Sequence, residues 1–181
     1  VAKDPKTLLP IPAVAEEWSI SADKKTYIFK IRKSALWSNG DSLTAHDFVW
    51  SWWRALQPKL GNQYAYMLFP IENAESFARG KITDFSRVGV KALSADLLEV
   101  KLSNPTPYFL QLLDHYSMFP VHKKTIEKFG KAHERGTLWT RPGNFVGNGP
   151  FILKEWHLFR SIVVEKNLNY WDLKKVSLNG I

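Results

Sequence analysis

The segment from Tyr27 to Arg54 constrains the fold of this chain more than any other stretch of its sequence. At its start, Tyr27, Phe29 and Ile31 occupy every second position, which is the period of a β-strand with one better-buried face. The sequence SNG at 38–40 then predicts a tight turn, because Asn and Gly tolerate positive φ angles. The segment therefore begins as a strand that runs into a turn.

A capped helix is expected directly after this turn. Thr44 is followed three residues later by Asp47, which resembles a capping box with Asp in place of Glu. Pro58 then ends the helix, because proline cannot continue one. Apolar residues at helical spacing form one face of this helix: Phe48, Val49, Trp52, Trp53 and Leu56. We expect Trp52 and Trp53, together with Trp18 and Trp37, to be core residues rather than a platform for a ligand.

The rest of the chain alternates short strands with short helices. Alternating apolar residues predict two strand pairs: 88–93 with 97–102, and 151–156 with 161–166. Capping and turn residues predict three short helices: 71–79, one opened by Thr106-Pro107, and 125–129. Strand pairs separated by short helices are typical of an α+β (mixed α/β) fold.

Composition excludes several classes of protein. A hydrophobic content of 45%, including eight Trp and eleven Phe, is ample for a packed core and excludes a disordered chain. No run of about 18 apolar residues occurs, so we expect no membrane-spanning helix, and no targeting signal is visible. The absence of Cys excludes disulfides and thiolate metal sites. The net charge of +8 is spread along the chain, which favours a solvated basic surface over a nucleic-acid patch.

No motif predicts catalysis, a cofactor or a metal site. Gly143, Gly147 and Gly149 cluster, but Pro150 follows them without the Lys and Ser or Thr of a phosphate-binding loop, so they predict turns. The five His residues show no short ligand spacing, and no GxSxG sequence is present. We therefore expect a non-enzymatic protein with no catalytic residues, no cofactor and no metal.

Several motifs in a fixed order resemble one known family. They are AxxW at Ala15–Trp18, YIFKIRK, WSNGDSLTAHDFVWSWWR, LEVKLSNPTPYFLQLL, the NG of FVGNGPF, and NYWD. This set resembles family 5 of the extracytoplasmic solute-binding proteins, and within it the oligopeptide-binding branch that serves ABC peptide importers. The resemblance covers nearly the whole chain, and an ordered set of motifs is more specific than any single one.

The resemblance implies a fold and a domain organisation. Such proteins have the two-lobed type II periplasmic-binding-protein fold, in which the lobes close over a ligand. We expect this chain to be part of one lobe, with the second lobe absent. Residues 1–122 are expected to form one compact α+β subdomain, and 123–181 an incomplete segment of a neighbouring subdomain on the hinge side.

The resemblance also implies a function and partners. The expected ligands are short peptides held between the lobes and delivered to the permease of an ABC importer in the membrane. The protein is expected in the periplasm or otherwise outside the cytoplasm, with a lipid anchor as one option. It is expected to bind no nucleic acid and to be monomeric at full length.

Two residues are predicted to bind the ligand through this resemblance. Tyr64 matches a family tyrosine that lines the peptide cleft, and His115 matches a histidine that faces the ligand-side pocket. A phenol and an imidazole both offer adaptable hydrogen bonds beside apolar surface. The structural alternatives are a buried aromatic residue for Tyr64 and an exposed residue near a helix C-terminus for His115.

Two other functions remain open at this point. One is a ligand-sensing domain of the same fold attached to a regulator, for which a DNA-binding helix-turn-helix would be diagnostic. The other is a hydrolase, for which a perturbed carboxylate pair or a Ser–His contact in a cleft would be diagnostic.

Overall fold

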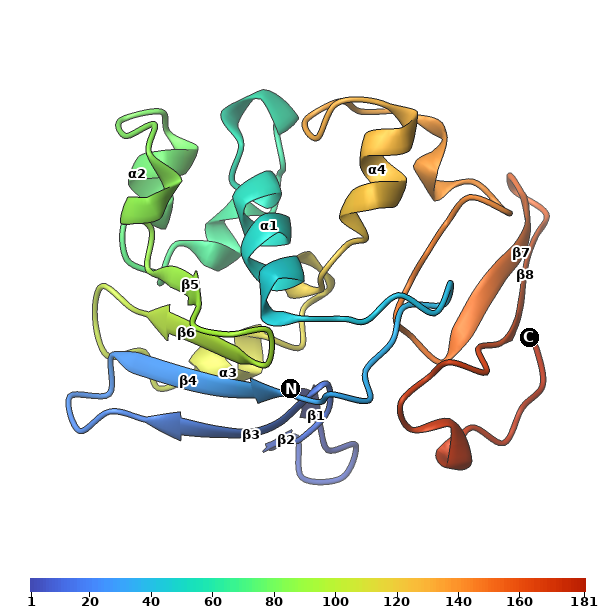
Figure 1. The fold of residues 1–181 in the computed structure, drawn as a ribbon, viewed down its shortest axis with the longest axis horizontal. Coiled ribbons are helices and arrows are strands. Elements are labelled where there is room, and N and C mark those ends of the chain that lie inside the picture. The colour runs from blue at the N-terminus through green and yellow to red at the C-terminus, as the bar shows by residue number, and fades with distance from the viewer. The chain divides into compact units, whose positions relative to one another are not determined.

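The strand predicted at Tyr27 is confirmed, and it is an inner strand of a four-stranded antiparallel sheet. The strands lie in this order across the sheet (Figure 1): β3 (Ala15–Ile20), β4 (Thr26–Ile31), β6 (Leu97–Lys101) and β5 (Val90–Ala92). Strands β5 and β6 are the hairpin expected from the sequence, with Val90 opposite Val100.

Alternate residues of β4 are buried, as the sequence pattern predicts. Tyr27, Phe29 and Ile31 are 4%, 3% and 2% exposed. Phe29 lies opposite Leu98 of β6, and Leu98 is itself 3% exposed. The period-2 pattern therefore fixes which face of the sheet forms the core, because a shift of one residue would turn these side chains to the other face.

Helix α1 (Ala45–Ala55) confirms the expected capping box. The backbone N–H and the hydroxyl of Thr44 both donate to a carboxylate oxygen of Asp47, at 2.7 and 2.9 Å. Trp52 is buried, and its indole N–H donates to the carbonyl oxygen of Met118 at 3.0 Å. The helix also packs on β5 and β6.

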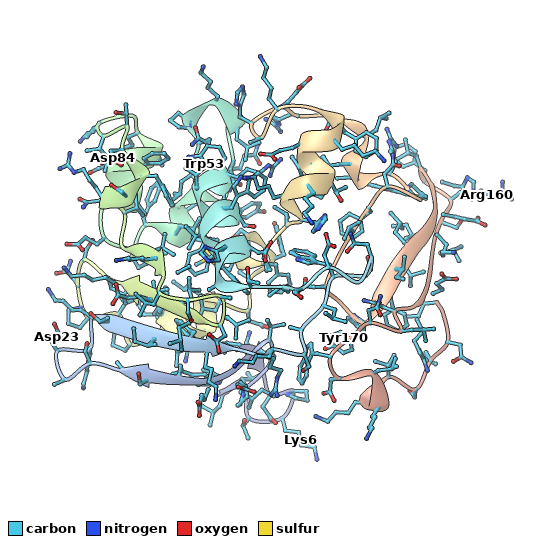
Figure 2. The ribbon with its side chains drawn as sticks, in the orientation of Figure 1. Lys6, Asp23, Trp53, Asp84, Arg160 and Tyr170 are labelled. Atoms are coloured by element: carbon cyan, nitrogen blue, oxygen red, sulfur yellow. The ribbon has the colours of Figure 1, made fainter.

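The predicted aromatic core is only partly correct. Trp37 and Trp52 are 1% and 2% exposed, whereas Trp18 and Trp53 are half-buried. Trp53 projects from α1 next to Trp50, with ring centroids 5.9 Å apart (Figure 2). Adjacent residues of a helix point about 100° apart, so Trp52 and Trp53 cannot both face the core fully.

The remaining regular elements are short. The helices are α2 (Ala74–Ala78), α3 (Phe109–Leu112) and α4 (Lys123–Phe129). The other strands are β1 (Ala2–Lys3), β2 (Pro10–Ile11), β7 (Phe151–His157) and β8 (Ser161–Lys166). The 3₁₀ turns are η1 (Pro58–Leu60), η2 (Ala65–Leu68), η3 (Phe85–Arg87), η4 (Tyr116–Met118), η5 (Leu138–Thr140) and η6 (Leu173–Lys175). None of the helices has the length and apolar character that crossing a bilayer requires.

Three predicted helix boundaries were wrong. The helix expected to open at Thr106-Pro107 begins at Phe109, because the Thr106 hydroxyl donates to the Asn104 carbonyl at 3.0 Å instead of capping a helix. Helix α2 is shorter than 71–79, and α4 begins two residues before 125. The early start of α4 has a clear cause, since His122 acts as its N-cap.

The computed structural model describes residues 1–181, which group into two compact units. The first unit contains 1–32 and 44–120, and the second contains 33–43 and 121–181. The second unit includes the turn at 38–40, because Ser38 N–H donates to the Gly147 carbonyl at 2.8 Å. The expected division at 122/123 within a larger lobe stays a prediction.

Candidate ligand-binding site

Tyr64 lies on the surface of the first unit, directly before η2. Gly61 ends η1 in the left-handed conformation at φ 60°, and the Asn62 side chain then accepts a hydrogen bond from the Tyr64 N–H at 3.0 Å. The Tyr64 side chain is 38% exposed, whereas Leu68 at the other end of η2 is fully buried. The alternative of a buried aromatic residue is therefore wrong for Tyr64.

His115 is held in place by the turn that it caps. Its Nδ1 accepts a hydrogen bond from the Ser117 N–H at 3.2 Å and lies 2.7 Å from the Ser117 hydroxyl. Because Nδ1 is the acceptor, the proton of the neutral ring lies on Nε2. The half-buried His115 ring thus has a defined tautomer, with Nε2–H available to an outside acceptor.

The structure brings the two predicted residues together. The ring centroids of Tyr64 and His115 are 5.2 Å apart, although the residues are separated by about fifty positions in the sequence. Tyr116 completes the group, with its ring centroid 4.2 Å from that of His115 and 5.3 Å from that of Tyr64. We call Tyr64, His115 and Tyr116 the aromatic triad.

Tyr116 is a candidate site residue that no sequence motif indicated. It is 61% exposed, and a hydrogen bond with the Tyr64 hydroxyl is the main cause that raises the pKa of its phenol. Its neighbour in the sequence, His115, carried the only signal that could have indicated it. The triad offers two hydroxyls and one ring N–H beside aromatic surface, which suits polar groups of an extended chain.

A hollow of about 290 Å³ lies beside His115 in the same unit. Apolar parts of Met67, Tyr108 and Leu112 line it, and it also contains a charged pair. In this pair, the Lys3 Nζ lies 3.4 Å from an Asp114 carboxylate oxygen, and both side chains are more than one-third exposed. Solvent screens such a pair, so its charges stay available to a ligand.

A second polar cluster lies in the second unit, beside a hollow of about 300 Å³. His122 Nε2 lies 3.1 Å from a carboxylate oxygen of Asp41, and His122 Nδ1 lies 2.7 Å from the Thr125 hydroxyl. This order of acid, base and hydroxyl resembles that of a hydrolase.

A structural role explains this cluster better. His122 Nδ1 also accepts the Thr125 backbone N–H at 3.3 Å, as the N-cap of α4. Its lone pair is therefore already used and is poorly placed to take a proton from the hydroxyl. The Asp41 carboxylate has a lowered pKa, first because Lys124 hydrogen-bonds to it at 3.0 Å and second because His122 does.

The other sequence motifs lie in structural positions. The glycine-rich loop leads into strand β7 rather than a helix, and Gly147 N–H donates to the Ser38 hydroxyl at 3.3 Å. His46 lies exposed in the first turn of α1, as expected. No three His, Asp or Glu side chains come together as metal ligands would.

Comparison with known proteins identifies relatives that match nearly the whole of this chain. The model of bacterial extracellular solute-binding proteins, family 5 (middle region), matches residues 10–181. The periplasmic oligopeptide-binding protein OppA of Escherichia coli is 43% identical over 176 residues, which covers 95% of this chain and 31% of that protein. The oligopeptide-binding protein OppA of Bacillus subtilis is 42% identical, covering 95% of this chain and 30% of that protein.

Solved structures are similar over the same extent. The substrate-binding domain of an oligopeptide ABC transporter from Bacillus anthracis has a TM-score of 0.91 at 42% identity, covering 99% of this chain and 33% of that one. Listeria monocytogenes OppA bound to peptide has a TM-score of 0.89 at 37% identity, covering 99% and 34%. The chain thus spans about a third of the length of these proteins, and the expected fold class, a portion of the two-lobed type II fold, is confirmed.

Proposed function

This chain belongs to the bacterial extracellular solute-binding proteins of family 5, and we propose that it forms part of a receptor that captures short peptides for an ABC importer. The observation that carries this proposal is the contact between Tyr64 and His115 on the surface of the first unit. The two residues that the family resemblance selects as ligand-binding lie in one aromatic group at the surface, next to a hollow.

Each member of the aromatic triad has a distinct role in this proposal. The Nε2–H of His115 donates to a backbone carbonyl or carboxylate of the peptide. The Tyr64 and Tyr116 hydroxyls, already in contact with each other, exchange hydrogen bonds with its backbone groups. Their ring faces cover apolar side chains, which gives affinity with little demand on sequence.

The proposal includes a place and a partner. The protein acts outside the cytoplasm, in the periplasm or attached by a lipid anchor, and passes its peptide unchanged to the importer's permease. The peptide is enclosed when a second lobe closes over it. Similar proteins support this class of ligand, since one of the solved structures is Haemophilus influenzae OppA in complex with the peptide RPPGFSPFR. The regulator and hydrolase alternatives gain no comparable support.

Identification of bound ligands tests the proposal. The protein, expressed from its complete coding sequence and purified without denaturant, is acid-treated, and the released molecules are analysed by mass spectrometry. We expect a mixture of short peptides, and we expect the emptied protein to bind tri- to pentapeptides in calorimetric titration. Release of a single non-peptide compound, with no heat upon peptide addition, would overturn the proposal.

A further inference from the structure

His122 is a buried histidine whose two ring nitrogens are both in use. The residue is 4% exposed. Its Nδ1 accepts the Thr125 backbone N–H at 3.3 Å and lies 2.7 Å from the Thr125 hydroxyl. Its Nε2 lies 3.1 Å from a carboxylate oxygen of Asp41. The ring therefore joins segment 33–43 to the start of helix α4, and these contacts all lie within the second unit.

The partners of the ring allow only one neutral tautomer. A backbone N–H can only donate, so the Nδ1 that faces Thr125 must carry the lone pair. An ionised carboxylate can only accept, so the Nε2 that faces Asp41 must carry the proton. The Thr125 hydroxyl is compatible with this assignment, because it can donate to Nδ1 as well. The N-cap of α4 thus depends on a histidine that is neutral at Nδ1.

The charged groups around the ring come from two elements. Asp41 lies in segment 33–43, and Lys124 and Lys128 of α4 line the same hollow as His122. The Lys124 Nζ lies 3.0 Å from the Asp41 carboxylate, and the pKa of that carboxyl is lowered. Neither η5, which packs on α4, nor the loop at 143–146 contributes a charged residue. Asp41 therefore stays ionised over the pH range in which a histidine gains its charge.

Uptake of a proton by His122 has different consequences at the two nitrogens. The proton must bind Nδ1, because Nε2 already carries one. Nδ1–H then faces the Thr125 N–H, donor against donor, and the cap hydrogen bond is lost. The Thr125 hydroxyl can turn to accept from Nδ1–H, and Nε2–H keeps the Asp41 carboxylate. The new charge also lies at the positive end of the helix dipole.

We propose that His122 is a pH-sensitive N-cap, which releases the first turn of α4 in acid while segment 33–43 stays attached. Histidine ordinarily changes its charge between about pH 5 and 8, so the release occurs in mildly acidic surroundings. The attachment of the segment persists because it does not depend on Nδ1. Besides the Asp41 contact, the Ser38 N–H donates to the Gly147 carbonyl at 2.8 Å.

The chain contains a matched helix whose cap has no histidine. Helix α1 is capped by Thr44 and Asp47. Asp47 and Thr125 occupy the same position, the third residue of their helices, where a backbone N–H has no acceptor within the helix. The two backbone amides can therefore be compared in one sample.

Two measurements between pH 7.5 and 5 test the proposal on the protein expressed from its complete coding sequence. Nitrogen–proton NMR spectra of the histidine rings report the tautomer and charge of His122, with the exposed His46 as the reference histidine. Hydrogen exchange resolved to single residues reports the protection of the Thr125, Asp47 and Ser38 amides, corrected for the intrinsic effect of pH.

We expect His122 to be the Nε2–H tautomer at pH 7.5 and to gain a proton on Nδ1 by pH 5. The protection of the Thr125 amide should then fall about fivefold, which corresponds to the loss of a typical N-cap. The Asp47 and Ser38 amides should keep their protection. In the variant His122→Asn, the Thr125 amide should keep its protection at both pH values, because Asn is a good N-cap that does not titrate.

Several results would overturn the proposal, and the first three need no variant. They are an Nδ1–H tautomer at pH 7.5, a ring that stays neutral at pH 5, and an unchanged Thr125 amide beside a protonated ring. Equal losses at Thr125 and Ser38 would show that acid opens the second unit as a whole. An equal loss of Thr125 protection in His122→Asn would show that another group is responsible.

Discussion

The imidazole of His115 lies against the phenol ring of Tyr64, with centroids 5.2 Å apart, and each side chain comes from a short turn that its own residue opens. Neither turn is long enough to be stable alone, so their mutual packing positions the rings. Tyr116 adds a second phenol to the same group. The candidate site is therefore built by non-local contacts within one unit.

The hydrogen bond between Tyr116 and Tyr64 predicts a measurable titration. It favours the neutral phenol, so the pKa of Tyr116 is raised above its ordinary value. The hydrogen bond therefore stabilises the folded protein at pH values below the unfolded tyrosine pKa of about 10. This stabilisation is lost as the pH rises through the higher pKa of Tyr116 in the folded protein. In Tyr64→Phe, we expect the pKa of Tyr116 to move down toward the ordinary value. Difference absorbance at 295 nm against the Tyr64→Phe/Tyr116→Phe variant measures this, and an unchanged pKa would contradict it.

Burial predicts a large stability difference between two tryptophans. Trp37→Ala should cost about 3–5 kcal/mol, because the 1% exposed indole packs edge-on against the His122 ring at 5.1 Å. Trp53→Ala should cost clearly less, because Trp53 is only half-buried on α1. Urea unfolding followed by fluorescence compares the two variants. Similar costs would show that the burial pattern around Trp37 is wrong.

Asp41 predicts an acid-sensitive contribution to stability. Its carboxylate pKa is lowered, first by Lys124 and then by His122. A carboxyl group whose pKa is lowered in the folded protein stabilises the fold at pH values above its unfolded pKa of about 3.9. This stabilisation is lost as the pH falls through the lower pKa of the folded protein. Solvent screens the partly exposed group, so we expect about 1 kcal/mol or less.

Asp41→Asn should therefore lower the unfolding free energy at pH 7 and leave it nearly unchanged below the folded pKa. The control is the variant Glu127→Gln. Glu127 lies on α4, and its carboxylate is about half exposed and 3.9 Å from the Lys123 Nζ. Urea unfolding at several pH values is the measurement. An effect of Asp41→Asn that stays constant between pH 7 and pH 2 would contradict the assignment.

We expect the position of Gly89, in the first unit, to tolerate no side chain. A Cβ at this position would lie 2.3 Å from the Lys101 carbonyl oxygen and 2.9 Å from the Glu72 Cβ. The backbone there is fixed, since Lys101 N–H donates to the Gly89 carbonyl at 2.7 Å. Gly89→Ala should cost about 1–3 kcal/mol or more through overpacking. Gly149→Ala, where a Cβ meets no atom within 4 Å, is the control, and equal unfolding free energies would contradict this geometry.

Local patterns predicted the parts of the fold that local forces determine. The alternation at Tyr27 and the Thr44–Asp47 pair were sufficient for β4 and for the start of α1. At Thr106, the hydroxyl had a competing partner in the Asn104 carbonyl, and propensity alone could not decide between the two.

Contacts distant in sequence were beyond prediction from the residues. The turn at 38–40 belongs to the second unit through hydrogen bonds such as Gly147 to Ser38, 109 positions apart. Tyr64 and His115 were selected only by resemblance to a family, and Tyr116 has no signal of its own before η2 and η4 meet. Groupings of this kind appear only in the tertiary packing and not in the spacing of residues along the sequence.

The measurement that tests the central claim most directly is calorimetric titration of a short peptide into the protein, expressed from its complete coding sequence, and into its site variants. Tyr64→Ala and His115→Ala should each weaken peptide binding about tenfold, or about 1.4 kcal/mol, because each variant loses a hydrogen bond or an aromatic contact to the ligand. His46→Ala, which removes an exposed histidine from α1, should bind as the unchanged protein does. Undiminished affinity in both Tyr64→Ala and His115→Ala would show that the aromatic triad does not hold the peptide.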